Sequence, residues 1–287
     1  MKLMTINTHS LIETQYEMKR VQLADFIMRE QPDIIAMQEV NQSVNAPLAE
    51  PELKEGFCPC AGQSVSVPLR QDNHAAQIAH LMRQRGWNPQ WTWVPAKLGY
   101  GKYDEGLALF SLHRPITALD AFRISRCDDY RNWKTRWTLG VQVDGDWYYT
   151  VHMGWWEDEE EPFKDQWHSL DSCLHSKKAA GTVWLLGDFN SPAEVRGQGY
   201  DCVHGVGWQD TFLMAQKKDQ GVTVEGVIDG WRDCVKEPSD GMRIDQIWCS
   251  KRMPIIDSSV VLNGRNGPVV SDHFGVIITY RKGEMES

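Results

Sequence analysis

The first 39 residues have the pattern of a strand, a helix and a second strand. Residues 2–7 alternate in polarity and predict a strand, and residues 18–30 place four apolar side chains on one helical face. Pro32 ends that helix, and the apolar run at 33–39 predicts the second strand. A helix between two strands favours parallel pairing of those strands, so we expect an α/β protein.

Short strands dominate the pattern after this unit. Asp144-Gly145-Asp146 separates two of them and is a strong signal for a hairpin turn. We expect helices at 72–85 and 163–178, and strands at 90–98, 106–111, 115–124, 136–143, 146–153, 182–186, 243–249, 257–262 and 273–280. Many strands and few helices predict two mixed β-sheets packed face to face with helices outside, which is a four-layer α/β sandwich.

Length and composition limit the kind of protein. The 287 residues are expected to form a single domain, 1–287, and residues 41–70 a long excursion that could act as a lid over a pocket. The net charge of −9 argues against binding of long nucleic acid, which usually requires a basic face. The sequence has no apolar run of transmembrane length and no secretory signal pattern. Scattered cysteines are typical of reduced thiols, so we expect a cytoplasmic protein without membrane partners.

Polar side chains stand at the ends of apolar strands along the whole chain. They are Asn7, Glu39, His152, Asp188, Asn190, Asp272 and His273. Ligands bind at strand ends in α/β folds, because the scaffold is rigid there and the edge is open. A hard cation such as Mg²⁺ prefers oxygen ligands, and a cation, a histidine and carboxylates are what phosphoester hydrolysis requires. Each residue alone is more often a turn former, a helix cap or a structural histidine, so the prediction depends on the whole set.

Five segments resemble a known superfamily. Asn7, Gln38-Glu39, Gly187-Asp188-Phe189-Asn190, Arg243-Ile244-Asp245-Gln246-Ile247 and Ser271-Asp272-His273 have the order and approximate spacing of the endonuclease/exonuclease/phosphatase superfamily. The resemblance spans nearly the whole chain. It implies a deoxyribonuclease-like sandwich that hydrolyses phosphoesters with Mg²⁺ as cofactor, or with Mn²⁺ in its place.

The resemblance assigns roles around the metal and the phosphate. Glu39 would be the principal metal ligand, with Asn7 and Asp272 near the metal. Asp188 would orient or activate the attacking water. Asn190 would hold the phosphate.

The resemblance also assigns roles to two histidines. His273 would contact the phosphate and be polarised by Asp245. His152 would lie where the leaving group is protonated in the pancreatic-type deoxyribonucleases. Glu105 is similar to the glutamate that precedes the central strand in the same relatives.

Two stretches bear on the choice of phosphoester. The acidic run 157–161 begins shortly after the strand that carries the predicted catalytic histidine. Such runs are usually solvated loops, but near a catalytic mouth this one would repel a nucleic acid backbone. Trp155 and Trp156 have faces that stack well on sugar rings. Arg131 and Arg136 are candidates for binding a phosphate, because a guanidinium suits bidentate contact with an oxyanion.

The details are most similar to the bacterial maltose 6'-phosphate phosphatases of this superfamily. The segments that carry this finer resemblance are Asn7-Thr8-His9-Ser10, Gln38-Glu39-Val40-Asn41-Gln42, Asp72-Asn73-His74, Tyr103-Asp104-Glu105-Gly106, Asp229-Gly230-Trp231 and Ser271-Asp272-His273-Phe274-Gly275. They imply a phosphatase of carbohydrate metabolism that acts on a small phosphorylated sugar. Two alternatives stay open: a DNA or RNA nuclease with the same chemistry, and a non-catalytic binding module with the same fold. A basic stripe beside the metal site would favour the nuclease, and a missing metal ligand would favour the module.

Overall fold

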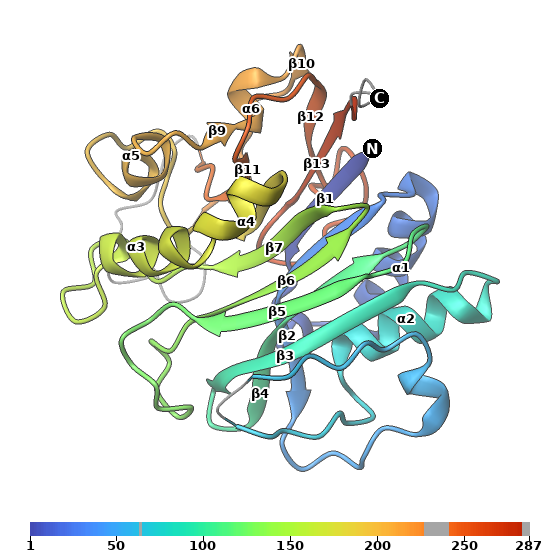
Figure 1. Cartoon of the computed structure of the whole chain (residues 1–287). Coiled ribbons are helices and arrows are strands. Elements are labelled where there is room, and N and C mark those ends of the chain that lie inside the picture. Colours follow the sequence, from blue (N-terminus) through green and yellow to red (C-terminus); the bar gives the residue numbers. More distant parts are fainter. Residues whose placement is uncertain (63–64, 227–240, 283–287) are drawn as a thin grey trace.

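The computed structural model describes residues 1–62, 65–226 and 241–282. Two β-sheets are stacked face to face, and helices lie on their outer sides (Figure 1). β1 (Lys2–Asn7), α1 (Tyr16–Glu30) and β2 (Ile34–Ser43) form the predicted strand–helix–strand unit, in which β1 and β2 pair in parallel. The predicted four-layer α/β sandwich of two mixed sheets is confirmed.

The first sheet contains seven strands in the order β10-β12-β13-β1-β2-β4-β3. Its further strands are β3 (Gln90–Gly99), β4 (Tyr103–Ser111), β10 (Lys217–Lys218), β12 (Ile255–Val261) and β13 (Gly275–Tyr280). β1 lies at its centre, parallel to β2 and antiparallel to β13. Both kinds of pairing are expected where a strand–helix–strand unit is joined to hairpins.

The second sheet contains six strands in the order β5-β6-β7-β8-β11-β9. They are β5 (Ala118–Arg123), β6 (Trp137–Val143), β7 (Asp146–His152), β8 (Val183–Asp188), β9 (Gln209–Asp210) and β11 (Asp245–Cys249). The predicted hairpin joins β6 to β7, and Asp144 and Gly145 have φ of 51° and 81°. This left-handed pair of residues matches the twist of the two strands. β7 and β8 pair in parallel, which places their ends at the same edge of the sheet.

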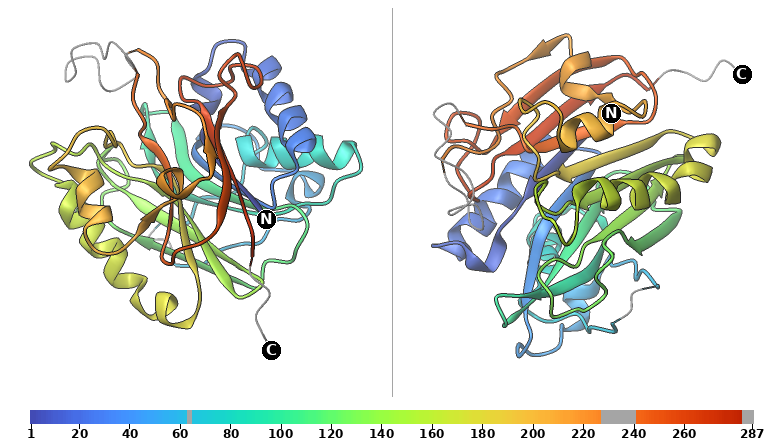
Figure 2. Two further views of the ribbon diagram at one scale, coloured as in Figure 1. Left: turned by 90° about the horizontal axis from the view of Figure 1, so that it is seen from above. Right: turned by 90° about the vertical axis from the view of Figure 1, so that its left-hand side faces the viewer.

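Three groups of apolar side chains hold the layers together. Between the sheets, Leu3, Leu139 and Leu186 are completely buried. α1 and α2 (His74–Gln84) cover the outer face of the first sheet, and α3 (Phe163–Cys173) and α5 (Gly199–His204) cover that of the second. Figure 2, left, shows these helices on opposite sides of the stacked strands. Removal of this apolar surface from water is the main contribution that stabilises the fold.

The predicted elements are present, with ends that differ by a few residues. The predicted helix at 163–178 is two helices, α3 and α4 (His175–Ala180). The sequence did not predict four elements: α5, α6 (Thr211–Met214), β9 and β10. None of them exceeds six residues, which is too short to show a hydrophobic period. Two 3₁₀ helices, Ser10–Ile12 and Pro51–Lys54, complete the described elements.

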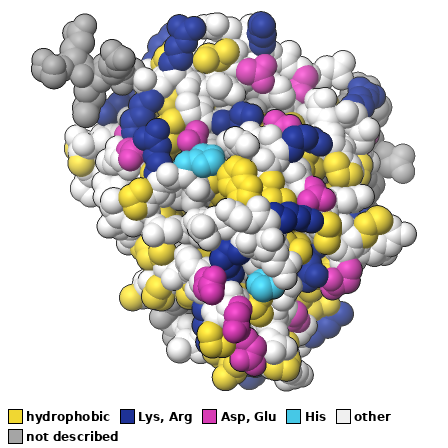
Figure 3. Space-filling model, turned by 90° about the vertical axis from the view of Figure 1, so that its right-hand side faces the viewer, with side chains coloured by type: hydrophobic (Ala, Val, Ile, Leu, Met, Phe, Trp, Pro, Cys, Tyr) yellow, Lys and Arg dark blue, Asp and Glu magenta, His cyan; other side chains and the backbone are white. Residues whose placement is uncertain are grey.

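Charges of both signs are mixed on the surface drawn in Figure 3. Lys and Arg side chains are interspersed there with Asp and Glu, and the described part of this face has no continuous basic stripe. This distribution gives no electrostatic reason to expect nucleic acid on that face. None of the described helices has the length and hydrophobicity that a membrane span requires.

Candidate metal and phosphate site

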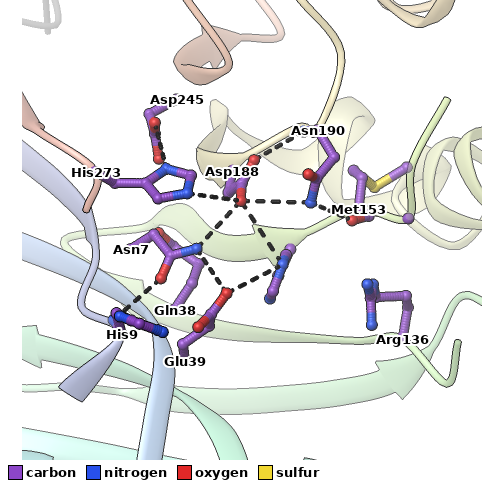
Figure 4. A network of polar contacts seen from close by, with 12 residues as sticks. Asn7, His9, Gln38, Glu39, Arg136, Met153, Asp188, Asn190, Asp245 and His273 are labelled. Carbon is purple, nitrogen blue, oxygen red and sulfur yellow. Dashed lines mark hydrogen bonds and ion pairs between the residues drawn. The ribbon is translucent and has the colours of Figure 1, made fainter. Parts of the chain in front are cut away.

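The predicted catalytic residues meet at one edge of the sandwich. In the first sheet, Asn7 at the end of β1 is paired with Gln38 of β2, and in the second His152 and Asp188 are paired at the ends of β7 and β8. Asp188 is also paired with Asp245 of β11. Figure 4 shows side chains from both sheets turned toward one another. Several of them line a cavity of about 1150 Å³.

A β-bulge places Glu39 in this cluster. The pairing of β2 with β4 changes register between Met37 and Val40, and Glu39 has a left-handed backbone with φ of 51°. The hydroxyls of Thr8 and Ser10 donate to the carbonyl oxygen of Glu39, at 3.1 and 2.7 Å. A left-handed conformation is strained for a non-glycine residue, and such strain is common at functional sites where surrounding contacts maintain it.

Asn7 holds two carboxylates together. Its Nδ2 donates to Glu39 Oε1 at 3.0 Å and to Asp188 Oδ2 at 3.2 Å. Its Oδ1 accepts a hydrogen bond from the backbone N–H of His9 at 3.2 Å. The prediction of Asn7 near the metal stays a prediction, and in this structure its oxygen accepts from a backbone amide while its nitrogen faces the carboxylates. Asn7 is placed to orient Glu39 and Asp188.

Asp188 is buried at the centre of this network. Its Oδ1 accepts a hydrogen bond from the backbone N–H of Asn190 at 2.8 Å, and Asn190 Nδ2 donates to the carbonyl oxygen of Met153 at 3.0 Å. Burial raises the pKa of Asp188 to about 7; the charge of His273 opposes this rise and that of Asp245 adds to it. A carboxylate with such a pKa can accept a proton from water near neutral pH.

His273 is held in one orientation by Asp245. Its Nδ1 lies 2.9 Å from Asp245 Oδ2, and its Nε2 lies 4.0 Å from Asp188 Oδ2. Burial lowers the pKa of His273, but the carboxylates of Asp245, Asp188 and Asp272 outweigh burial and hold the pKa well above its usual value. A charged imidazole donates from both nitrogens, so Nε2 is available to an anionic oxygen in the cavity.

His152 is the second buried histidine of the cluster. Its Nε2 lies 3.6 Å from Asp188 Oδ2, and its Nδ1 lies 4.0 Å from Glu105 Oε1. Burial, together with the charges of Arg136 and Lys97, holds the pKa of His152 well below its usual value. The imidazole is neutral in this state. Protonation of a leaving group by His152 therefore requires a bound anion that raises its pKa again.

Glu39 and Asp272 are the two carboxylates of the predicted metal site, and their charges are close enough to interact. Burial raises the pKa of Glu39, and the charges of Glu105 and Asp272 raise it further. His9 Nδ1 lies 2.7 Å from Glu13 Oε1 and 3.7 Å from Asp272 Oδ1. Burial lowers the pKa of His9, but its hydrogen bond to Glu13 and the nearby carboxylates raise it to about 9. Clustered carboxylates that repel one another are stabilised by a cation, and oxygen donors fit Mg²⁺ or Mn²⁺.

We expect Mg²⁺ to bind this site more tightly at pH 8 than at pH 6. The pKa of Asp188 is raised to about 7, so most of this carboxyl is protonated at pH 6, and a cation held beside it must displace that proton. Displacement of one proton with a pKa near 7 makes the affinity about tenfold weaker at pH 6 than at pH 8. Isothermal titration of the metal-free protein at both pH values measures this difference. Glu39→Gln is expected to abolish the binding, and a pH-independent affinity would contradict the assignment.

One wall of the cavity is built from the turn between β3 and β4 and from two longer loops, 124–136 and 153–162. The side chains that line it are Tyr100, Trp133, Trp155 and the acidic residues 157–160. Lys134 joins the loops, because its Nζ lies 2.8 Å from both Asp158 Oδ2 and Glu160 Oε2. Glu161 accepts hydrogen bonds from two backbone N–H groups of the other loop, at 2.9 and 2.5 Å. The acidic run therefore lies beside the cavity as part of a fixed wall.

The four predicted substrate-binding residues divide into two pairs. Arg136 and Trp155 line the cavity. Arg131 is exposed and does not line it, because its loop directs the side chain to solvent. Trp156 packs against the apolar cluster under α3 and meets Trp155 edge to face. Arg131 and Trp156 therefore lie outside the cavity lining, and their predicted part in substrate binding stays a prediction.

Other segments noted in the sequence have structural roles. Three apolar side chains of residues 41–70 are buried in the core cluster beside α2, and no described residue of this segment lines the cavity. The described part of the segment is therefore not a lid. Asn73 caps α2 by accepting a hydrogen bond from the backbone N–H of Ala76 at 3.1 Å. The motif Asp229-Gly230-Trp231 lies outside the described residues.

The cavity lining also contains two lysines that the sequence did not point to, Lys97 and Lys134. Lys97 interrupts an apolar run in β3, and a charge in such a run is a signal that could have been followed. Lys134 had no such signal, because it stands in a polar loop among other charged residues. Only the fold brings it opposite the acidic run.

A two-sheet α/β sandwich whose strand ends gather amide, carboxylate and imidazole groups around a cavity defines the class of deoxyribonuclease-like proteins. The chain belongs to the endonuclease/exonuclease/phosphatase family, because that family's model matches residues 4–273. The family predicted from the sequence is thus confirmed, and its members are hydrolases of phosphoesters. No curated protein sequence matched this chain.

Solved structures agree with this family. An endonuclease/exonuclease/phosphatase family protein from Leptotrichia buccalis is 28% identical with a TM-score of 0.82, over 98% of this chain and 100% of the other. A mannosyl-6-phosphatase from Bacteroides thetaiotaomicron is 14% identical with a TM-score of 0.66, over 98% and 100%. A 3'-5' exonuclease from Neisseria meningitidis is 18% identical with a TM-score of 0.60, also over 98% and 100%. The last two similarities show the fold alone.

Proposed function

We propose that the protein is a Mg²⁺-dependent phosphatase that removes phosphate from a small phosphorylated sugar, such as maltose 6'-phosphate. The observation that supports this most is the cavity, in which Asp188, Asn190 and His273 lie together with Trp133 and Trp155. A sugar phosphate has an anionic group and a ring with apolar faces, so it complements both kinds of lining. The proposed role lies in carbohydrate metabolism, and the proposed location is the cytoplasm.

Glu39 and Asp272 would hold the cation. Ser271 supports Asp272, because its Oγ donates to the carbonyl oxygen of Asn7 at 2.8 Å and lies 3.3 Å from Asp272 Oδ1. When bound, Mg²⁺ would neutralise part of the phosphate charge and polarise a phosphoryl oxygen. Asn7 would keep Glu39 and Asp188 in position for this role.

The side chains around the phosphate would carry out the proton transfers. Asp188 takes a proton from the attacking water, whose oxygen forms the new bond to phosphorus. His273 donates from Nε2 to a phosphate oxygen, and Asn190 holds the phosphate beside it. The bond from phosphorus to the sugar oxygen breaks, and that oxygen receives a proton from His152, once the bound anion has raised the pKa of His152.

A nuclease is the second candidate, and the Neisseria exonuclease with the same fold is the observation in its favour. The four carboxylates at 157–160 oppose it, because they stand beside the cavity that a polyanion would have to approach. A non-catalytic module is opposed by the predicted set: Glu39, His152, Asp188 and His273 line the cavity, and Asp245 is bonded to His273. We therefore favour the phosphatase.

A substrate panel tests this proposal. With Mg²⁺ present, we expect rapid phosphate release from maltose 6'-phosphate and none from plasmid DNA. Release from glucose 6-phosphate should be slower, because it has no second ring to contact Trp133 and Trp155. The ratio of kcat/KM between the two sugars should exceed about tenfold, because the second ring adds contacts with the aromatic wall. Trp133→Ala is expected to reduce that ratio. Rapid cleavage of DNA with inert sugars would reverse the order of the two candidates.

A further inference from the structure

Lys97 is a buried charge that the mechanism above does not use. Its side chain is 9% exposed, it stands in an apolar run of β3, and it lines the cavity. Its Nζ lies 2.9 Å from Glu105 Oε1, and Glu105 is its one ion-pair partner in the part of the chain that the structure describes. A buried ammonium is costly to desolvate, so an apolar side chain would stabilise β3 better if packing were the only requirement.

Arg136 is a second buried cation in the same cavity. Its Nη1 donates to the carbonyl oxygen of Trp133 at 2.7 Å, and its Nε has no hydrogen-bond partner among the described residues. Among the described residues, no carboxylate lies at ion-pair distance from the Arg136 guanidinium. Burial lowers the pKa of Lys97, and the charge of Arg136 lowers it further, so the two cations are close enough to repel each other. Figure 4 shows the guanidinium of Arg136 turned toward the polar network without a bond to it.

Both cations act on His152, and of the two only Lys97 has a carboxylate at ion-pair distance among the described residues, that of Glu105. Glu105 is too far from His152 for a hydrogen bond, at 4.0 Å, and its charge is directed to Lys97 instead. Lys97 and Arg136 both lower the pKa of His152, so their fields reach the histidine that faces Asp188. The two cations line the same cavity as Asp188, Asn190 and His273, the proposed phosphate position, where they would stabilise an anion with more than one charge.

We propose that Lys97 and Arg136 select phosphate monoesters over diesters by binding the third terminal oxygen that only a monoester has. The proposal rests on the phosphatase function above. A monoester carries between one and two negative charges near pH 7 and three terminal oxygens, whereas a diester carries one charge and two such oxygens. Glu105 uses one donor of the Lys97 ammonium and leaves two, and the Arg136 guanidinium also has unbonded donors.

Kinetics with p-nitrophenyl phosphate and methyl p-nitrophenyl phosphate test this selection, because the two esters differ only by a methyl group on one oxygen. Lys97→Met is expected to lower kcat/KM for the monoester by about 100-fold, and for the diester by less than about threefold. Lys97→Arg keeps a cation and should keep most of the preference. Lys102→Met, at an exposed lysine outside the cavity lining, is the matched control and should change neither value. Equal losses on both esters after Lys97→Met would overturn the proposal.

A double variant separates phosphate binding from neutralisation of Glu105. If Lys97 binds the phosphate, Lys97→Met/Glu105→Gln still lacks the preference for the monoester; if Lys97 only neutralises Glu105, the double variant regains it and the proposal fails. This variant removes both charges of the Lys97–Glu105 pair, so neither is left buried without its partner, and it also serves if Lys97→Met does not fold. For an ester that is not turned over, its competitive inhibition constant measures the loss of binding in each variant. A wild-type protein that releases no phosphate from any monoester would instead refute the phosphatase function.

Discussion

Asp188→Asn is expected to lower kcat for phosphate release by about 1000-fold while the protein stays folded. The amide cannot take a proton from water, but it has the size of the carboxylate and can keep the contacts to Asn7 and Asn190. Burial already disfavours the charge of Asp188, so its removal should not lower the melting temperature. Phosphate release at saturating substrate and Mg²⁺, together with a thermal melt, measures both effects.

The control for this variant is Asp201→Asn. Asp201 lies in α5 and forms a surface ion pair with Arg196, so the variant makes the same chemical change away from the site. It should retain full activity, because surface ion pairs contribute little and this one does not line the cavity. Full activity in purified Asp188→Asn would show that another group activates the water, and the proposed mechanism would then be wrong.

Gly187→Ala is expected to destabilise the protein by about 3 kcal/mol and to abolish activity. Gly187 has φ of 155°, and a Cβ there would lie 1.9 Å from the carbonyl oxygen of Val151. Val151 and Gly187 are paired neighbours in β7 and β8, and the next pair is His152 with Asp188. A methyl group would separate the strands immediately before the two catalytic side chains. Urea denaturation with linear extrapolation measures the loss of stability.

Gly145→Ala is the matched control, since Gly145 also has a positive φ, 81°, but no atom lies within 4 Å of its Cβ position. Backbone strain alone should cost about 1 kcal/mol there and leave activity unchanged. If Gly187→Ala and Gly145→Ala have equal effects, the close approach of β7 to β8 is not what requires glycine at position 187.

The sequence predicted the sheet architecture well because its information is local. The apolar runs that became β1, β2 and β8 are bounded by Pro, Gly or polar residues; β1 ends in Asn7, β8 ends in Asp188, and the apolar part of β2 is followed by Gln38 and Glu39. The Asp144-Gly145 turn required only two residues to be recognised. Elements of two to six residues, such as β9 and α5, carry no comparable signal and were missed.

The site was predicted less completely, because orientation depends on contacts between distant segments. Gln-Glu at positions 38 and 39 was recognised, but the bulge that turns Glu39 outward depends on hydroxyls of the preceding loop. The orientation of Asn7 is decided by the backbone of His9 and by two carboxylates from other strands. Arg131 and Arg136 were equivalent in the sequence, and only the path of their loop separates the exposed one from the buried one.

The central claim is that side chains from both sheets hold one cation and one phosphate on the floor of this cavity. A crystal grown with Mn²⁺ and inorganic phosphate tests it directly, because anomalous scattering locates the manganese. We predict a manganese peak in contact with Glu39 and Asp272, and a phosphate that touches it and His273. A peak held instead by His9, Glu13 and Asp272, whose possible ligand atoms lie within 4.8 Å of one another, or no peak in the cavity, would contradict the account.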